Sequence, residues 1–300
     1  MISRFADARL PEARWDRILL GTVQLGLAYG GRRREVPLDD QVVHAILDRA
    51  WSLGVRGFDT AECYGNAASR LAEWLRAQGK LKDSFIVTKI FPPHVTDKIH
   101  VEAACQRFAG ACSIMLLSHG PVDQRTFSKF RTLTTALGAE AGQSVYTASE
   151  VEAAGRNGVT RVQAPVNVFD SRQLETAHRC GVAIDGRSIY LQGVLLDEPA
   201  IAESRVTGAG VVARAVQSAA KAVGLSAAPA LLAGVLAQMG AYDRAVIGAD
   251  APHQLEHIAA ALEAPCHAVG AFLAMLADLR GQKLAVAHLL DPRTWPQPGT

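Results

Sequence analysis

The strongest constraint on the fold is a regular alternation between short apolar runs and longer segments of helical periodicity. The apolar runs predict eight strands, at 17–22, 56–60, 85–90, 113–119, 143–147, 161–166, 182–189 and 244–249. The intervening segments predict helices at 39–54, 67–79, around 97–110, and at 124–138, 149–157, 171–181, 211–224 and 252–263. Strands that alternate with helices are typical of a parallel sheet covered by helices.

Eight such pairs predict a (β/α)8 TIM barrel, which we expect to occupy residues 1–300 as a single α/β domain. Two additional helical segments, 226–240 and 267–281, are expected as extra helices outside the barrel, and the Pro-rich end of the chain is expected to cover a rim or to fray. A doubly wound open sheet is the alternative. It usually carries GxGxxG after its first strand, whereas this chain has GTVQLGLAYGG there.

Composition narrows the class of partner. The formal net charge is +2 with both signs interspersed, which argues against a nucleic acid or a membrane surface and favours a small-molecule partner. The five cysteines are scattered, without CxxC spacing, and no apolar run reaches the roughly 18 residues of a membrane span, so we expect a cytoplasmic protein. No metal site is expected from the histidines.

Four residues with chemically active side chains follow or end neighbouring predicted strands. Asp59 and Tyr64 belong to FDTAECYGN, Lys89 lies within FIVTKI, and His119 follows MLLS. Because the active site of a (β/α)8 barrel lies at the carboxyl ends of its strands, these side chains should meet at one rim. Each alone has an ordinary structural explanation, as a turn, packing or buried residue, but their combination favours a site.

The chemistry that needs this set is proton delivery to a carbonyl. An ammonium beside a tyrosine stabilises phenolate, so Lys89 is expected to lower the pKa of Tyr64. Asp59 would hold Lys89 charged and oriented, and His119 would polarise the substrate oxygen or complete a proton relay. None of the four stores electrons, so a reduction would need a cofactor that carries hydride.

These residues and their surroundings resemble the aldo-keto reductase family, in the manner of its bacterial members. The resemblance rests on LGTVQLG, GVRGFDTAECYGN (54–66), FIVTKI, MLLSHGP, SVYTASEVEAA, VQAPVN, RSIYLQGVL and VIGADAPHQLEHI, in family order; the DTAxxYG core is the most specific. It implies a (β/α)8 barrel and hydride transfer between a nicotinamide cofactor and an aldehyde or ketone. By the same resemblance, Tyr64 is the general acid, Lys89 and Asp59 tune it, and His119 orients the carbonyl.

The resemblance also implies a set of cofactor-binding residues. They are Gly21, Thr22, Ser144, Gln163, Arg187, Ser188, Gly248, Asp250 and Gln254. Two positions depart from the family pattern: Val145 replaces an asparagine, and Arg187 replaces the aromatic residue that stacks on the nicotinamide. An arginine is planar and can stack or pair with a phosphate.

The cofactor is therefore expected to be NADP(H) or NAD(H), with no evident site for the 2′-phosphate. Residues 248–251 read Gly-Ala-Asp-Ala, where the family often places a cation, and Asp250 would repel a phosphate, so weak discrimination between the two cofactors is expected. The substrate is expected to be a small-molecule carbonyl compound, sugar-like by resemblance. Two other functions stay open: a redox-neutral lyase or isomerase that uses the same four residues, and a cofactor-sensing binding protein. The oligomeric state is not predicted.

Overall fold

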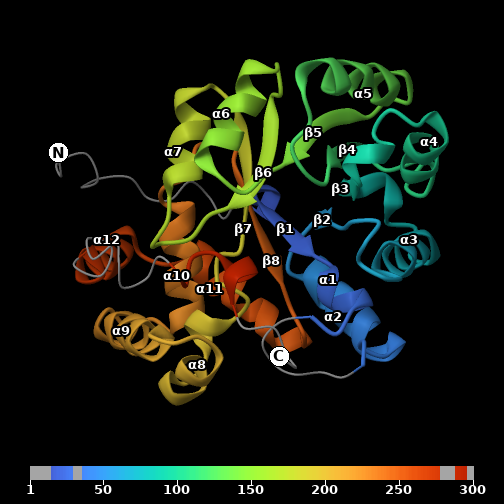
Figure 1. The fold of residues 1–300 in the computed structure, drawn as a ribbon. Coiled ribbons are helices and arrows are strands. Elements are labelled where there is room, and N and C mark those ends of the chain that lie inside the picture. Colours follow the sequence, from blue (N-terminus) through green and yellow to red (C-terminus); the bar gives the residue numbers. More distant parts are fainter. Residues whose placement is uncertain (1–14, 30–35, 278–287, 296–300) are drawn as a thin grey trace.

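Eight parallel strands close into a barrel with helices around it (Figure 1), as the sequence predicts. The computed structural model describes residues 15–29, 36–277 and 288–295. Each strand pairs with the next one along the chain, and β8 pairs with β1. The strands are β1 (Ile18–Gly21), β2 (Gly57–Asp59), β3 (Phe85–Ile90), β4 (Ser113–Ser118), β5 (Glu140–Ser144), β6 (Arg161–Pro165), β7 (Ala183–Arg187) and β8 (Arg244–Gly248).

The fifth strand begins three residues earlier than expected and ends at Ser144. Ala141 and Gly142, both weak strand formers, pair with Leu116 and Leu117 of β4, so the contacts of the sheet override local propensity. The predicted strand end at 147 is wrong because Thr147 is the N-cap of the next helix. Its side chain accepts from the backbone N–H of Glu150, whose carboxylate accepts in return from the N–H of Thr147.

The helices lie on the outside of the barrel (Figure 1). They are α1 (Val23–Gly26), α2 (Asp40–Ser52), α3 (Ala67–Ala77), α4 (Lys98–Gln106), α5 (Gln124–Ala136), α6 (Ala148–Arg156), α7 (Arg172–Arg179), α8 (Pro199–Arg205), α9 (Ala209–Ala222), α10 (Ala227–Leu236), α11 (Glu256–Leu262) and α12 (Cys266–Met275). Short 3-10 helices include η3 (Pro92–His94) and η5 (Pro252–Leu255). Helix α8 lies within the connection 193–210, for which no helix was expected.

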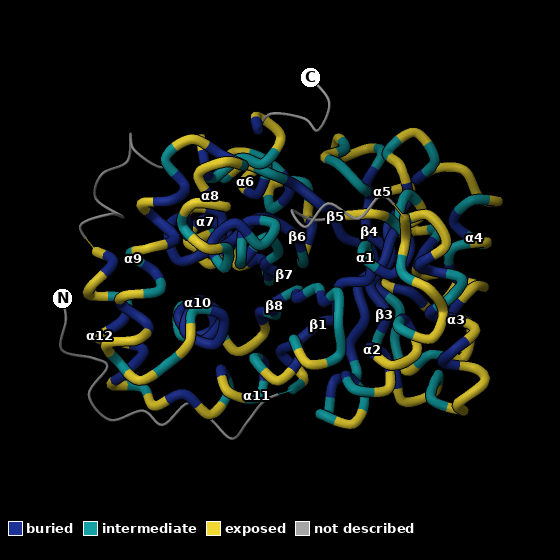
Figure 2. The backbone as a smooth tube through the Cα atoms, turned by 90° about the horizontal axis from the view of Figure 1, so that it is seen from below, coloured by how far each residue is buried: buried dark blue, intermediate teal, exposed yellow. Residues whose placement is uncertain are grey.

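The extra helices build up the part of the structure that follows β7. Helix α10 is buried at every residue from Ala228 to Leu236 and contacts β8, α9, α11 and α12 (Figure 2). Helix α12 packs on α9 and α10. Among the described residues no single helix is long and apolar enough to span a membrane, although two bent helix pairs, α9 with α10 and residues 252–262 with α12, reach that length and hydropathy together.

The barrel interior changes from apolar to polar along the strands. Leu19, Val87, Met115 and Leu117 form a small buried cluster, against which Phe85 packs. Because side chains alternate across a strand, Lys89 lies on the same face of β3 as Phe85 and Val87. The pleat of β3 thus delivers a buried lysine to the interior, toward the carboxyl end of the barrel.

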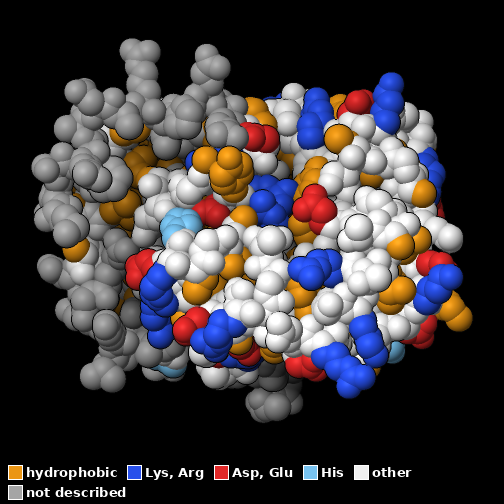
Figure 3. Space-filling view, turned by 90° about the horizontal axis from the view of Figure 1, so that it is seen from above, with side chains coloured by type: hydrophobic (Ala, Val, Ile, Leu, Met, Phe, Trp, Pro, Cys, Tyr) orange, Lys and Arg blue, Asp and Glu red, His pale blue; other side chains and the backbone are white. Residues whose placement is uncertain are grey.

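Charged side chains of both signs are interspersed on the face of the molecule shown in Figure 3. This arrangement agrees with the near-neutral balance of the sequence, which has 31 basic and 29 acidic residues. It provides no single-sign field on this face of the kind that steers nucleic acids.

Candidate active site

Lys89 is the centre of a buried hydrogen-bond network at the carboxyl end of the barrel. Its Nζ lies 2.7 Å from Oδ1 of Asp59, 2.9 Å from the carbonyl oxygen of Thr60 and 3.4 Å from the hydroxyl of Tyr64. The side chains of Lys89 and Asp59 are 0% and 4% exposed, so the ion pair is screened from water. Burial lowers the pKa of Lys89, but the charge of Asp59 and then Tyr64 raise it by more. The net pKa is above its usual value, so the ammonium stays charged.

Gln163 joins this network from β6, on the opposite side of the barrel. Its Nε2 donates to Oδ1 of Asp59 at 2.7 Å, the same oxygen that binds Lys89. The other end of its amide, Oε1, is buried without a hydrogen-bond partner among the described residues. Since buried polar atoms are normally paired, Oε1 is an acceptor available to a bound group.

Tyr64 is held by a turn that packs tightly on the first helical segment. Its backbone N–H donates to the carbonyl of Ala61, and Gly65 continues the turn with φ of +58°. Gly26 lies directly against this turn, because a Cβ at position 26 would fall 2.0 Å from the carbonyl oxygen of Tyr64. The close approach fixes the height of the phenol above Lys89.

The structure corrects one expectation about Tyr64. Burial raises its pKa, and the opposing charge of Lys89 does not overcome this, so the net pKa lies above the ordinary value rather than below it. The tyrosine therefore stays a neutral phenol through the physiological range, and its O–H is a donor. The ammonium stabilises the phenolate only when the proton has left.

His119 lies beside Tyr64 with its ring roughly perpendicular, at 6.1 Å between ring centroids. Burial first, and then the positive charges of Lys89 and Arg187, lower the pKa of His119 to about 4. The imidazole is therefore neutral at neutral pH. Its Nδ1 lies 3.3 Å from Sγ of Cys63, whose own pKa is raised by burial. In the tautomer in which the thiol donates to Nδ1, the ring proton is on Nε2.

The expected cofactor residues lie along the same rim. Two of them, Gly21 and Thr22, also contact neighbouring strands of the barrel. Gly21 is paired in register with Asp59 on one side and Gly248 on the other. Thr22 donates from both its N–H and its Oγ1 to the carbonyl of Asp59. Ser144 is the register partner of Gln163 and is 6% exposed.

Arg187 and Ser188 begin a segment with an unusual backbone. Ser188, Leu191 and Gln192 all have positive φ, at 63°, 46° and 52°, which costs free energy for residues with a side chain. The guanidinium of Arg187 stacks on the ring of Tyr146 at 4.1 Å, and its charge contributes to lowering the pKa of His119. Strained backbone of this kind is common where a loop is shaped to bind.

The last expected group begins with Gly248, the final residue of β8, and continues after the strand with Asp250 and Gln254. The backbone N–H of Asp250 donates to Oε1 of Gln254 at 2.7 Å, which closes the turn into η5. Farther along, Glu256 forms a two-pronged ion pair with Arg49 of α2, at 2.6 and 2.7 Å. The guanidinium of Arg49 is therefore already paired with a carboxylate. Residues 248–254 contain no lysine or arginine.

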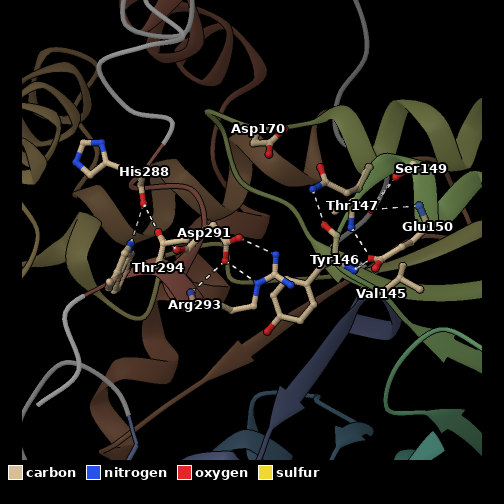
Figure 4. Close-up of polar contacts among 12 residues, drawn as sticks. Val145, Tyr146, Thr147, Ser149, Glu150, Asp170, His288, Asp291, Arg293 and Thr294 are labelled. Atoms are coloured by element: carbon tan, nitrogen blue, oxygen red, sulfur yellow. Dashed lines mark hydrogen bonds and ion pairs between the residues drawn. The ribbon is translucent and has the colours of Figure 1, made fainter.

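The C-terminal segment packs over the rim beside β5 (Figure 4). Arg293 lies over the ring of Tyr146 at 4.0 Å and is paired with Asp291, so Tyr146 contacts two guanidinium groups. Trp295 donates from Nε1 to the carbonyl of His288, which closes this segment on itself. The expectation that the tail covers a rim is met by residues 291–295; residues 296–300 lie outside the described chain.

The structure thus brings Asp59, Tyr64, Lys89 and His119 together as the sequence predicts. Sequence reasoning missed the contact between Cys63 and His119, because no spacing rule connects residues 56 positions apart. It assigned Gln163 to the cofactor alone and missed its bond to Asp59, for the same reason. The signal available for Cys63 was its place directly before Tyr64.

Together, the closed barrel and the hydrogen-bonded set of Asp59, Lys89 and Tyr64 at its carboxyl rim are those of a (β/α)8-barrel enzyme. Residues 17–112 match the model of the aldo/keto reductase family, and this stretch contains all of β1 to β3 with Asp59, Tyr64 and Lys89. Over this stretch, about a third of its length, the chain is similar to the aldo/keto reductase family. The resemblance on which the family expectation rested is confirmed.

Solved structures show the same fold. The glycerol dehydrogenase from Gluconobacter oxydans is similar over 95% of this chain and 94% of its own, with 16% identity and a TM-score of 0.68. An aldo/keto reductase from Klebsiella pneumoniae, solved with NADP and acetate, covers 88% of this chain and 91% of its own, with 20% identity and a TM-score of 0.61. No curated protein was found to match the chain.

Proposed function

We propose that the protein reduces an aldehyde or ketone to an alcohol, or catalyses the reverse oxidation, with NAD(P)(H) as hydride carrier and Tyr64 as general acid. The observation that carries the proposal is the buried chain from Asp59 through Lys89 to the hydroxyl of Tyr64. A neutral phenol beside a fixed ammonium donates a proton to a developing alkoxide and leaves a stabilised phenolate. The raised pKa of Tyr64 keeps the donor protonated at neutral pH.

His119 supports the same step from the other side. With its proton on Nε2, the neutral imidazole donates a hydrogen bond to the carbonyl oxygen and does not compete with Tyr64 as an acid. Cys63 is a positioning residue in this scheme, since it acts only through the ring of His119. The exposed aromatic surfaces of Phe91, which contacts His119, and of Tyr29, whose pKa responds to Tyr64, favour a small organic substrate. A sugar-like substrate is part of the proposal.

The residues present fit a nicotinamide cofactor. The free Oε1 of Gln163 and the hydroxyl of Ser144 would hold the carboxamide, and the segment from Arg187 to Gln192 would hold the pyrophosphate. The bound cofactor supplies the hydride that these side chains cannot. Because Asp250 follows β8 in a segment without cations, we expect NADH and NADPH to bind with affinities within about tenfold of each other.

The test is a pair of measurements on the wild type and Tyr64→Phe. Titration of NADH and NADPH, followed by nicotinamide fluorescence, should give the same dissociation constants for both proteins. Turnover over a panel of aldehydes, ketones and sugars should fall by roughly 100-fold to 10,000-fold in the variant, which is the usual contribution of a general acid. Tyr242→Phe is the matched control, because that side chain is 82% exposed and should leave turnover unchanged.

The outcome also separates the alternatives. Turnover without any nicotinamide would support the redox-neutral lyase or isomerase, and cofactor binding without turnover across the panel would support the binding protein. An active Tyr64→Phe variant would overturn the proposed role of the phenol. The scattered spacing of the five cysteines fits the expected cytoplasmic location, which belongs to the same proposal.

A further inference from the structure

A cluster of metal-type ligands lies next to the active-site turn, outside the residues described so far. Glu62 from the turn after β2, His94 from η3 and His100 from the first turn of α4 each offer one ligand atom, and these atoms lie within 4.8 Å of one another. We propose that Glu62, His94 and His100 form a site for a divalent transition-metal ion such as Zn²⁺. The proposal is independent of the reaction assigned above.

His100 is already arranged as a metal ligand would be. Its Nδ1 lies 2.9 Å from Oδ2 of Asp97, whose other oxygen accepts from the backbone N–H of Ile99. Metal-bound histidines usually donate their second ring N–H to a carboxylate in this way, which fixes the ring and raises the basicity of the free nitrogen. The contact leaves Nε2 of His100 as the atom that faces a ligand.

His94 provides a second, separate observation. Its Nδ1 is buried and has no hydrogen-bond partner among the described residues. Buried ring nitrogens are normally paired, so this ring has an unmet requirement. The ring also stacks on His100 at 4.1 Å with 29° between planes. Two protonated imidazoles would repel each other at this distance, whereas two neutral rings, the form that binds metal, would not.

Glu62 completes the set as the movable ligand. It is exposed, and its carboxylate forms no hydrogen bond or ion pair with another described residue. Ligand atoms around a tetrahedral Zn²⁺ lie roughly 3.3 Å apart when each bond is about 2 Å. The present ligand atoms lie within 4.8 Å of one another, so they need to close by at most about 1.5 Å. A free glutamate can supply this by rotation. Arg107 lines the same cleft as Glu62 and His100.

The ligand set selects the kind of ion. Two imidazoles and one carboxylate suit Zn²⁺, Co²⁺ or Ni²⁺ rather than Mg²⁺ or Ca²⁺, which prefer oxygen ligands. The site would join the turn that contains Tyr64 to the segment after β3, where Phe91 packs on His119. Occupancy would therefore fasten two parts of the rim to each other.

The experiment uses untagged, full-length protein dialysed against a chelator, then titrated with Co²⁺ and followed by visible absorption, with Zn²⁺ calorimetry in parallel. We expect one ion per chain, an affinity at least about tenfold weaker in His100→Gln and in Glu62→Gln, and a smaller loss in Asp97→Asn. His44→Gln is the matched control, since His44 is exposed on α2 and should not change binding. Melting of the metal-free proteins shows whether each variant folds.

Three results would overturn the proposal. One is no saturable binding by the wild type. Another is an affinity in both His100→Gln and Glu62→Gln that equals that of the wild type. The third is binding that disappears in Cys63→Ser but not in those variants, because it would assign the ion to the pair of Cys63 and His119 instead.

Discussion

Removing the negative charge of Asp59 should destabilise the protein strongly, because it isolates a buried ammonium. In Asp59→Asn the side chain keeps its size and one acceptor oxygen, so Lys89 retains neutral hydrogen-bond partners, including the carbonyl of Thr60 and the hydroxyl of Tyr64, but loses the opposite charge of the carboxylate. Both members of the pair are almost fully buried and lie 2.7 Å apart. Breaking such a pair by changing one partner typically costs about 3–5 kcal/mol of folding free energy.

The double variant Asp59→Asn/Lys89→Met makes this reasoning testable. It removes both charges, so its loss of stability should be smaller than the sum of the two single losses by at least about 1–2 kcal/mol. Unfolding in urea, followed by the fluorescence of the tryptophans, gives these free energies. Arg156→Gln is the control: it breaks an exposed ion pair with Glu152 and should cost less than about 1 kcal/mol. Two results would refute this reasoning: additive losses of unfolding free energy in the double variant, or a loss below about 1 kcal/mol in Asp59→Asn. Either would show that the two charges do not stabilise each other in the folded protein.

Three further predictions concern the rim. Cys63→Val should lower kcat by roughly threefold to tenfold, which corresponds to the loss of one hydrogen bond. Cys63→Ser keeps a donor for His119, so its kcat should stay near that of the wild type. Equal losses in both variants would contradict the positioning role of Cys63. Gly26→Ala must displace the turn of Tyr64 and should lower kcat by roughly 100-fold. Gly270→Ala places a Cβ where no other atom is near, so its kcat should not change. Equal kcat values in the two variants would contradict this prediction. His119 has a pKa of about 4 in the folded protein and 6.5 when exposed. The stability contributed by its neutral form is therefore complete above pH 6.5 and is lost as the pH falls toward 4. His119→Gln should flatten this part of the pH dependence of the unfolding free energy, and an unchanged slope would contradict the prediction.

The barrel could be predicted because its signal is repeated eight times along the chain. Each apolar run gives only a weak indication of a strand, but their regular alternation with helices leaves few other folds. The start of β5 could not be predicted, because Ala141 and Gly142 are in a strand only through their pairing with β4. Helix α8 was missed for a related reason: its seven residues follow Pro199 in a long connection without a clear apolar period.

The meeting of Asp59, Tyr64, Lys89 and His119 was equally predictable, since strand ends and the pleat determine where these residues lie. Lys89 stood out as a charge within an apolar strand, and the alternation along β3 places it inside. The direction of the pKa shift of Tyr64 was not predictable. It is a balance between burial and the charge of Lys89, and the sequence indicates the charge but not the depth of burial.

The network around Gln163 changes how the two halves of the site relate. In the sequence, the four expected acid–base residues and the expected cofactor residues form two separate groups. The first group is complete, whereas the second departs from the family pattern at two positions. In the structure, Gln163 donates to the same oxygen of Asp59 that holds Lys89, while its own Oε1 is left as an acceptor. A group that binds Oε1 orients the whole amide, and therefore also the donor that Asp59 receives. Because Asp59 orients Lys89, and Lys89 contacts Tyr64, the proposed function would couple cofactor binding to proton donation through the side chain of Gln163.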